Sequence, residues 1–359
     1  MAHSSNDAKT GQTYSVGIVG ASGYTGAELM RLLAGHPNFS IKIATGDSQA
    51  GESVAALYPS LAAVYRDRVY DHYDPETLDG LDLVFCGLPH GVSMERVPEF
   101  LHKVGKVVDL GSDFRLRDKA LYPQWYGAEH SHPELLDQAA YGLPELFRSE
   151  IREAKLIAAT GCNAATATFA LAPLLAAGLV EAEPLVVDLK TGVSGAGRPP
   201  KSHTTFCTVD GDVNAYGVLT HRHTPEIEQA LGEATGVTPS VLFTPHLVPM
   251  SRGILATCYG RPTEKGQLAT TSDVREAVAD YYRDEPFFVV SDRPPSTKAT
   301  AGANTVHLSA WRDPRTGMIM SMAALDNLMK GASGMAVQCA NIACGLPETT
   351  GLTMIGMYP

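Results

Sequence analysis

Short apolar runs alternate with stretches of helical spacing along the first half of the chain. Residues 15–19 read as a buried strand, and residues 26–34 carry leucines at helical spacing until Gly35 and Pro37 end the pattern. Further strands are predicted at residues 41–45, 83–87, 107–110 and 156–159, with a helix at 92–104. This alternation is typical of an α/β fold with a doubly wound, mostly parallel sheet.

The pattern changes beyond Thr160, where a long apolar helix is predicted at residues 164–177. A helix at 273–282 has Asp273 and Glu276 placed for a capping arrangement. The remaining predicted elements are strands at 185–190, 241–244 and 253–259, a hairpin of 306–310 with 318–325 around a turn at 313–317, and a final helix at about 328–344. The second half therefore predicts an α+β domain with a mixed sheet, and the boundary gives domains at residues 13–160 and 161–327.

Composition narrows the class of protein. A chain of 359 residues is long enough for two domains with real cores. Its 39 acidic and 28 basic residues give a net charge of −11, which argues against a nucleic-acid or anionic membrane surface but not against a small anionic substrate. Residues 1–12 are polar and lack the apolar segment of a signal peptide, and no apolar run is long enough for a bilayer. We expect a loose N-terminal tail and a cytoplasmic protein.

A glycine-rich loop connects the first predicted strand to the first predicted helix. Its GxxGxxG spacing differs from the usual GxGxxG, but a strand precedes it and a helix follows it. Glycines allow a pyrophosphate to approach the backbone, and a helix N-terminus offers free N–H groups to it. The predicted dinucleotide contacts are Gly20, Ser22, Gly23, Tyr24, Thr25 and Gly26. A tight turn that binds nothing is the alternative.

The residues after the second strand leave the choice of dinucleotide open. Asp47 favours the free ribose hydroxyls of NAD, whereas Ser48 tolerates the 2′-phosphate of NADP. No arginine follows to decide between them.

Cys162 stands apart from the other five cysteines, which show neither CxxC nor zinc spacing. It lies between a strand and a helix, so we expect it in the first helical turn. Backbone N–H groups there stabilise a thiolate and lower the pKa of the thiol, which would make Cys162 a nucleophile. The alternative is a small buried side chain at a domain junction.

Two further segments carry candidate catalytic and phosphate-binding groups. In the segment 221–223, His221 or His223 is a candidate general acid–base, with a metal site or a surface cap before a helix at Pro225 as alternatives. The candidate ligands for phosphate or carboxylate are Arg115, Arg222 and the glycine-rich loop residues Ser194, Gly195 and Arg198. The alternative for Arg115 is an ion pair with a nearby aspartate. The alternative for the glycine-rich loop is a plain connection between two strands.

Nine segments together resemble the N-acetyl-gamma-glutamyl-phosphate reductases, which are relatives of aspartate-semialdehyde dehydrogenase. They are GASGYTGAEL at 20–29, GLPHG at 87–91, SDFRL at 112–116, YGLPEL at 141–146, GCNA at 161–164, GVSGAGR at 192–198, HRHTPEI at 221–227, SRGIL at 251–255 and DNLMKGASG at 326–334. Their order and spacing along nearly the whole chain make the resemblance specific.

The resemblance implies an NADPH-dependent reduction of an acyl phosphate to an aldehyde through a thioester on Cys162, in arginine biosynthesis. It implies a Rossmann domain, a second domain for catalysis and oligomer contacts in a homodimer or homotetramer, and a segment 328–359 that returns to the Rossmann domain. His221, slightly preferred to His223, would be the acid–base. Pro89, His90 and Asn327 would lie near the cofactor.

One segment departs from the arginine branch. Many members of that branch look like GCYPT at the cysteine, whereas this chain has GCNAA at 161–165. That form is similar to lysine-branch relatives, which reduce an aminoadipyl phosphate held on an acidic carrier protein. The acidic charge of this chain disfavours such a carrier. A lysine-branch or aspartate-semialdehyde enzyme and a non-catalytic dinucleotide sensor are the alternatives.

Overall fold

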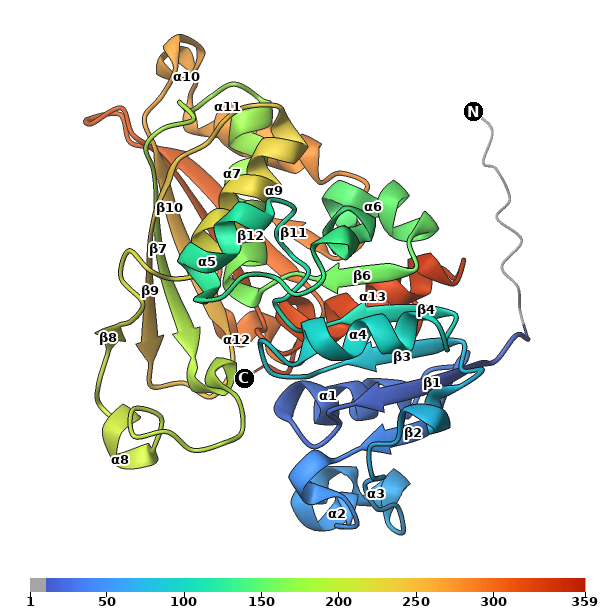
Figure 1. The fold of residues 1–359 in the computed structure, drawn as a ribbon. Helices are drawn as coiled ribbons and strands as arrows, with labels where there is room; N and C mark the ends of the chain where they lie inside the picture. The colour runs from blue at the N-terminus through green and yellow to red at the C-terminus, as the bar shows by residue number, and fades with distance from the viewer. Residues whose placement is uncertain (1–10, 359) are drawn as a thin grey trace. The chain divides into compact units, whose positions relative to one another are not determined.

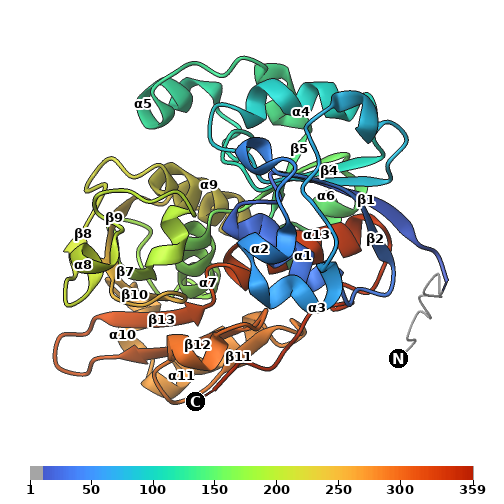
Figure 2. The same ribbon diagram turned by 90° about the horizontal axis from the view of Figure 1, so that it is seen from below.

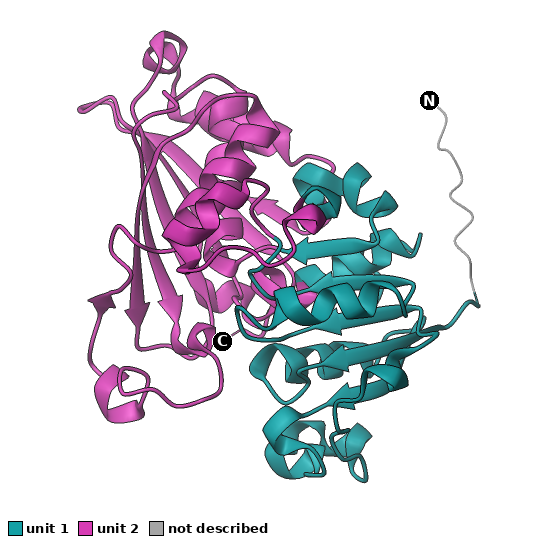
Figure 3. Cartoon of the chain, viewed as in Figure 1, with its two compact units in different colours: residues 1–114, 137–159, 335–352 teal, residues 115–136, 160–334, 353–359 magenta. Residues whose placement is uncertain are grey.

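The computed structural model describes residues 11–358 and divides into two compact units, which Figure 3 colours separately. The first unit comprises the chain up to residue 114 with residues 137–159 and 335–352, and the second comprises residues 115–136, 160–334 and 353–359. The predicted tail falls almost entirely on residues 1–10, which lie outside the described residues.

The first unit is built on a six-stranded sheet in which every pair of neighbours is parallel. Its order is β2 (Phe39–Thr45), β1 (Tyr14–Val19), β3 (Leu83–Cys86), β4 (Lys106–Asp109), β6 (Leu156–Ala159) and β5 (Ala139–Gly142). Strands β3 and β6 are buried along their whole length, as expected for a parallel sheet covered on both faces. The predicted doubly wound α/β sheet is confirmed, and the order reverses between β1 and β3, where such sheets bind ligands.

Helices cover both faces of this sheet. Figure 2 shows α4 (Ser93–Leu101) on one side and α1 (Tyr24–Leu33) with α13 (Gly334–Ala343) on the other. The remaining helices of the unit are α2 (Val54–Leu57), α3 (Ala62–Tyr65) and α6 (Pro144–Glu153). Past its first residue α13 belongs to this unit, where the Tyr14 hydroxyl donates to the carbonyl oxygen of Cys344 at 2.8 Å.

The second unit contains a seven-stranded mixed sheet. Its order is β11 (Phe288–Val290), β12 (Val306–Arg312), β13 (Ile319–Leu325), β10 (Ile254–Gly260), β7 (Leu185–Gly192), β9 (Val241–Val248) and β8 (Asn214–Ala215). The predicted hairpin of β12 and β13 is present and is visible in Figure 2. Helices α7 (Cys162–Ala176), α9 (His223–Thr235) and α11 (Thr271–Tyr281) pack on one face (Figure 1). The short helices are α5 (Tyr122–Tyr126), α8 (Phe206–Val209), α10 (Glu264–Leu268) and α12 (Thr297–Thr300).

Three local features differ from the sequence-based expectations. The capping box of α11 joins Thr270 to Asp273, rather than Asp273 to Glu276, because the helix begins two residues earlier than predicted. Residues 329–333 form a π-helical turn ahead of α13, where one continuous helix was expected. Residues 115–136 belong to the second unit, since the Arg117 side chain donates to Glu233 of α9 at 2.8 Å.

Within the described part of the chain, every helix is too short or too polar to cross a lipid bilayer.

Candidate active site

Cys162 is the first residue of α7, as predicted, and Gly161 is the N-cap. Gly161 has ordinary φ and ψ angles, so close packing requires the glycine here. A Cβ at position 161 would lie 2.3 Å from Nε2 of His223 and 2.7 Å from Nη1 of Arg115. The missing side chain therefore lets an imidazole and a guanidinium approach the turn that carries the thiol.

The pKa of Cys162 is raised to about 11, contrary to the expected decrease. Burial is the largest cause, because it disfavours the charged thiolate. The nearby Arg115 and the backbone N–H of Asn163 lower the pKa, as the helix terminus predicts, while the charge of Glu226 raises it. The sulfur is therefore a thiol at neutral pH, and its use as a nucleophile requires removal of the proton.

Glu226 joins the residues around Cys162, although the sequence gave it no role. Its fully buried carboxylate accepts hydrogen bonds from the Gly161 backbone N–H at 2.7 Å and from the Thr160 hydroxyl at 3.0 Å. Its other oxygen lies 3.4 Å from Nη1 of Arg115 and 3.8 Å from Nε2 of His223. The only sequence signal is its place three residues after His223 on one face of α9.

The two histidines lie together at the start of α9. Their ring centroids are 4.7 Å apart, and the His221 ring also meets the rings of Tyr216 and Phe243 edge to face. Nδ1 of His221 accepts the backbone N–H of His223 at 3.1 Å. A neutral His221 therefore carries its proton on Nε2.

Both imidazoles are held neutral. Burial, assisted by the neighbouring charge of Arg222 and opposed by Glu226, lowers the pKa of His221 to about 4. Burial also holds the pKa of His223 well below its ordinary value, with His221, Arg115 and Arg222 adding to the effect. The paired rings are therefore hydrogen-bonding groups at neutral pH rather than cations.

A pocket of about 400 Å³ in the second unit opens onto these groups. Its lining includes Cys162, Gly195, His221, Arg222 and His223 from the predicted set. The lining residues that the sequence gave no site role are Trp125, Asn163, Thr191, Gly192, Ala196, Lys201, His203, Asn214, Tyr216, Gly217, Thr220 and Leu247. This lining contains basic side chains and no carboxylate, so it suits an anionic ligand.

The other predicted phosphate ligands do not line this pocket. Arg115 is 7 % exposed, and its Nη1 lies 3.4 Å from the Glu226 carboxylate. The Ser194 hydroxyl accepts a hydrogen bond from the Asn327 side chain at 2.9 Å, and neither Ser194 nor Arg198 lines the pocket.

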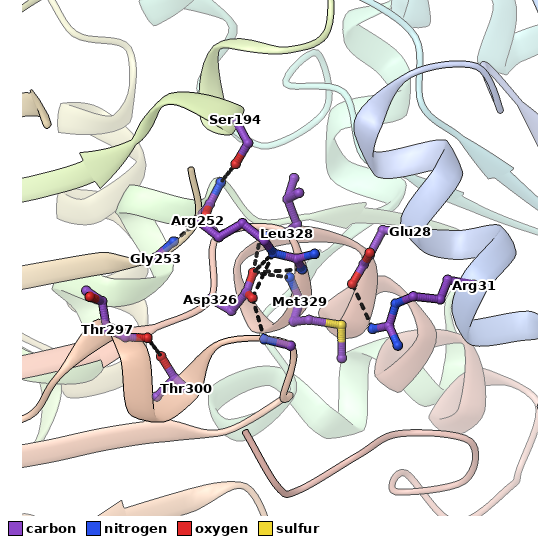
Figure 4. A network of polar contacts seen from close by, with 12 residues as sticks. Glu28, Arg31, Ser194, Arg252, Gly253, Thr297, Thr300, Asp326, Leu328 and Met329 are labelled. Atoms are coloured by element: carbon purple, nitrogen blue, oxygen red, sulfur yellow. Dashed lines mark hydrogen bonds and ion pairs between the residues drawn. The ribbon is translucent and has the colours of Figure 1, made fainter. Parts of the chain in front are cut away.

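Asp326 organises the turn that follows β13 (Figure 4). Its buried carboxylate pairs with the Arg252 guanidinium at 2.9 Å and accepts the backbone N–H groups of Gly302, Leu328 and Met329. Next to it, Oδ1 of Asn327 accepts the Gly253 N–H at 2.7 Å. These bonds fix the start of the π-helical turn at 329–333.

This turn packs directly against the candidate nucleophile. A Cβ at Gly331 would lie 2.8 Å from the Cβ of Cys162. Real side-chain contacts are longer than this, so only glycine allows the turn to come so close.

In the first unit, the glycine loop has the geometry of an anion cradle. Gly20 has φ +89°, and a Cβ there would lie 2.5 Å from the Gly87 carbonyl oxygen. A Cβ at Gly26 would lie 2.4 Å from the Cα of Ala21. The N-cap of α1, Gly23, provides no side-chain cap, so the first helical N–H groups suit a pyrophosphate.

Other predicted cofactor residues of this unit lie at the ends of β2 and β3, the two strands that flank β1. Ser48 is exposed just after β2, and the loop after β3 carries Pro89 and His90. Nδ1 of His90 pairs with the buried Asp113 carboxylate, which also accepts the Gly91 and Met94 N–H groups at 2.9 Å each. Asp113, which the sequence gave no role, therefore fixes the loop around His90.

Both halves of the chain match one enzyme class. Residues 15–154 match the family description "Semialdehyde dehydrogenase, NAD binding domain", and residues 162–327 match "Semialdehyde dehydrogenase, dimerisation domain". Among solved structures, aspartate semialdehyde dehydrogenase II from Vibrio cholerae has 17% identity and a TM-score of 0.69 over 93% of this chain and 98% of that chain. The enzyme from Candida albicans, solved with NADP, has 18% identity and a TM-score of 0.68 over 93% and 99%. The chain thus has the fold of the semialdehyde dehydrogenases, and both of its halves match the models of that class.

Relatives that match over nearly their whole length identify one family within this enzyme class. The N-acetyl-gamma-glutamyl-phosphate reductase of Desulforudis audaxviator is 49% identical over 96% of this chain and 99% of its own length. The enzyme of the same name from Symbiobacterium thermophilum is 47% identical over 97% and 100%. The chain belongs to the N-acetyl-gamma-glutamyl-phosphate reductase family, and the resemblance seen in the sequence is confirmed.

Proposed function

We propose that this chain reduces N-acetyl-L-glutamyl 5-phosphate to N-acetyl-L-glutamate 5-semialdehyde and phosphate, as a step of arginine biosynthesis. The observation that carries the proposal is the Cys162 thiol in the wall of a pocket with basic side chains and no carboxylate. This lining suits a small molecule that bears both a phosphate and a carboxylate. The names of relatives up to 49% identical support the same reaction.

NADPH is the proposed hydride donor, and its chemistry is transfer of that hydride to the acyl carbon. At Gly20 and Gly26 a Cβ would collide with the backbone, so these glycines allow the tight turn into α1, and the uncapped N–H groups at the start of that helix fit a dinucleotide pyrophosphate. The residues proposed to hold the dinucleotide are Gly20, Ser22, Gly23, Tyr24, Thr25, Gly26, Ser48, Pro89, His90 and Asn327. Ser48 supports NADP, and Asp47 beside it is the reason to measure NADH as well.

Cys162 is the proposed nucleophile. Its sulfur attacks the acyl carbon and expels phosphate, which leaves a thioester, and the thioester becomes a thiohemiacetal once hydride is added. The thiohemiacetal oxyanion collapses to the aldehyde and returns the thiolate. The departing phosphate takes up the proton that the Cys162 thiol loses, and the returned thiolate regains a proton from solvent, so each cycle consumes one proton.

His221 is the proposed partner of the reacting oxygen. Because its Nδ1 accepts a backbone N–H, its Nε2–H is the group that can donate to the oxygen as negative charge develops. His223 lies nearer to the buried carboxylate of Glu226, so we assign it a supporting role. The pKa of His221, about 4, keeps it a neutral donor at the pH of the cell.

The substrate's anionic groups need cations. Arg222 and Lys201 line the pocket and are the nearest proposed partners for phosphate and carboxylate. Arg115, Ser194, Gly195 and Arg198 remain proposed ligands for substrate or phosphate. Asn163 lies in the segment that resembles the lysine branch, so an aminoadipyl phosphate is the second candidate substrate.

We propose that two copies pair through the uncovered face of the seven-stranded sheet. The register aligns five outward apolar side chains across it: Leu242, Val186, Tyr259, Met320 and Trp311. Leu242 is 47% exposed in the single chain. A continuous apolar row of this kind is typical of a subunit interface, and the family description of residues 162–327 names dimerisation. We also propose a cytoplasmic location, in keeping with the free cysteines.

The test of the proposed function is NADPH oxidation with N-acetylglutamyl phosphate, measured beside aminoadipyl and aspartyl phosphates and beside NADH. We expect the N-acetylglutamyl substrate and NADPH to give the highest kcat/KM. The variant Cys162→Ser should bind NADPH like the wild type and lose at least about 10³-fold in kcat, because the covalent step is lost. A matched Cys207→Ser change, at an exposed cysteine, should leave kcat unchanged. Full turnover by Cys162→Ser, or no turnover of any acyl phosphate by the wild type, contradicts the proposal.

A further inference from the structure

Asn163 connects the sulfur of Cys162 to the hydroxyl of Tyr216. The thiol of Cys162 donates to Oδ1 of Asn163, with 3.7 Å between sulfur and oxygen. The other end of the same carboxamide, Nδ2, donates to the Tyr216 hydroxyl at 3.1 Å. Asn163 is 2 % exposed, so water does not compete freely for its polar atoms. The three side chains form a short chain of hydrogen bonds that ends at the sulfur.

Each member of this chain can both donate and accept a hydrogen bond. A carboxamide has an acceptor at one end and a donor at the other, and the two ends are nearly identical in shape. A phenol hydroxyl both donates and accepts. The direction of the hydrogen bonds can therefore reverse without any movement of the backbone.

We propose that Asn163 and Tyr216 form a reversible relay that gives Cys162 a hydrogen-bond partner both as a thiol and as a thiolate. With the thiol, the S–H donates to Oδ1, and Nδ2 donates to the phenol oxygen, as in the structure. With the thiolate, the carboxamide is turned over, Nδ2–H donates to the sulfur, and the phenol O–H donates to Oδ1. No proton moves along the relay, and the proton lost by the sulfur is the one taken up by the departing phosphate.

The surroundings explain why the thiolate needs this partner. The charged and titratable groups around the sulfur are Arg115, Glu226, Arg222, His221 and His223. Arg115, which lowers the pKa of the sulfur, is shared with the Glu226 carboxylate, and both imidazoles are neutral, so the charges around the sulfur do not offset its burial. A donor turned toward the sulfur supplies part of the missing stabilisation.

The relay requires the Tyr216 hydroxyl to be protonated, and it is. Burial raises the pKa of Tyr216 to about 12, and the Cys162 sulfur contributes to the increase. The phenol therefore keeps its proton at neutral pH and can donate it to Oδ1. Tyr216 acts through Asn163 and is a positioning residue, whereas Asn163 contacts the reacting sulfur itself.

The test is the pH dependence of alkylation of Cys162 by iodoacetamide, followed by mass spectrometry of the peptide that contains it. In Tyr216→Phe, we expect the midpoint to rise by about one to two pH units and kcat to fall about tenfold, because the phenylalanine cannot donate to Oδ1. Cys207 is exposed and serves in the same digest as the internal reference, with an unchanged midpoint. The matched variant Tyr281→Phe changes a tyrosine of α11 outside the pocket lining and should leave both midpoints unchanged.

Asn163→Ala provides a second, independent measurement. It should raise the Cys162 midpoint by about as much as Tyr216→Phe, and the double variant should add nothing, since both changes break one relay. An unchanged or lower midpoint in Tyr216→Phe, or additive shifts in the double variant, overturns the relay. The relay rests on Cys162 as the proposed nucleophile, but the alkylation assay needs no substrate. A failed relay with normal turnover is therefore distinguishable from a failed function, in which Cys162→Ser keeps its activity.

Discussion

At the scale of single residues, burial and a few nearby charges together determine whether Cys162 keeps its proton. The helix terminus acts on Cys162 in the expected direction, yet burial and Glu226 outweigh it and keep the proton on the sulfur. Glu226 has two opposite effects, because it fixes the Gly161 turn by hydrogen bonds and also disfavours a negative sulfur. The same carboxylate thus fixes the geometry of the turn and adds to the effect of burial on the pKa of Cys162.

The assignment of roles to the two histidines is testable at this scale. His221→Ala removes the Nε2–H donor, and we expect kcat to fall about 10²- to 10⁴-fold while NADPH affinity is unchanged. The control is His203→Ala, which removes another imidazole of the same pocket and should change mainly KM. Steady-state kinetics with varied acyl phosphate separates the two outcomes. Equal losses of kcat in both variants would contradict the role of His221.

At the scale of elements, close backbone packing positions the reacting group. Helix α7 is buried along nearly all of its length, so close packing holds the helix that carries Cys162 in place. The π-helical turn at 329–333 approaches the same residue, and Asp326 anchors the beginning of that turn. Single π-helical turns of this kind often mark functional sites.

Gly331→Ala tests this packing. Because the new Cβ would lie 2.8 Å from the Cβ of Cys162, either the turn or the start of α7 must shift. We expect kcat to fall at least about tenfold, together with a loss of roughly 1–3 kcal/mol in the free energy of unfolding. Denaturant unfolding and turnover measure the two effects.

The control for this change is Gly35→Ala, where a Cβ meets nothing within 4 Å. It should leave kcat unchanged and lower the free energy of unfolding by less than about 0.5 kcal/mol. If Gly331→Ala behaved like this control, the turn would not position Cys162.

At the scale of the whole molecule, the mixed sheet carries the surface that we propose for assembly. Its inner face is covered by α7, α9 and α11, and the outer face presents the apolar row that ends at Leu242. Alternation along β9 explains this pattern, since Val241 and Phe243 are buried while Leu242 is exposed.

Leu242→Asp tests the proposed pairing. A carboxylate in an apolar interface costs several kcal/mol of association free energy, so we expect a homodimer to become monomeric. Light scattering after size-exclusion chromatography gives the mass of each species, with Val64→Asp on exposed α3 as the matched control. A wild-type monomer, or a dimer that keeps its mass in Leu242→Asp, would contradict the proposed interface.

The sequence alone determined the features that depend on neighbouring residues. The parallel sheet, the hairpin of β12 and β13, the glycine loop before α1 and the start of α7 at Cys162 follow from local periodicity and glycine placement. The motifs also sufficed to recognise the family, because their order along the chain is specific.

Only the tertiary structure decided which distant residues meet. Glu226 and Arg115 are 111 residues apart and join beside Gly161, and Tyr216 reaches Asn163 from 53 residues away. Burial cannot be read from the chain around a residue, so the raised pKa of Cys162 had no local signal. Helix dipoles and hydrogen-bonding side chains act locally and are visible in sequence, whereas desolvation and long-range charge depend on the packed environment.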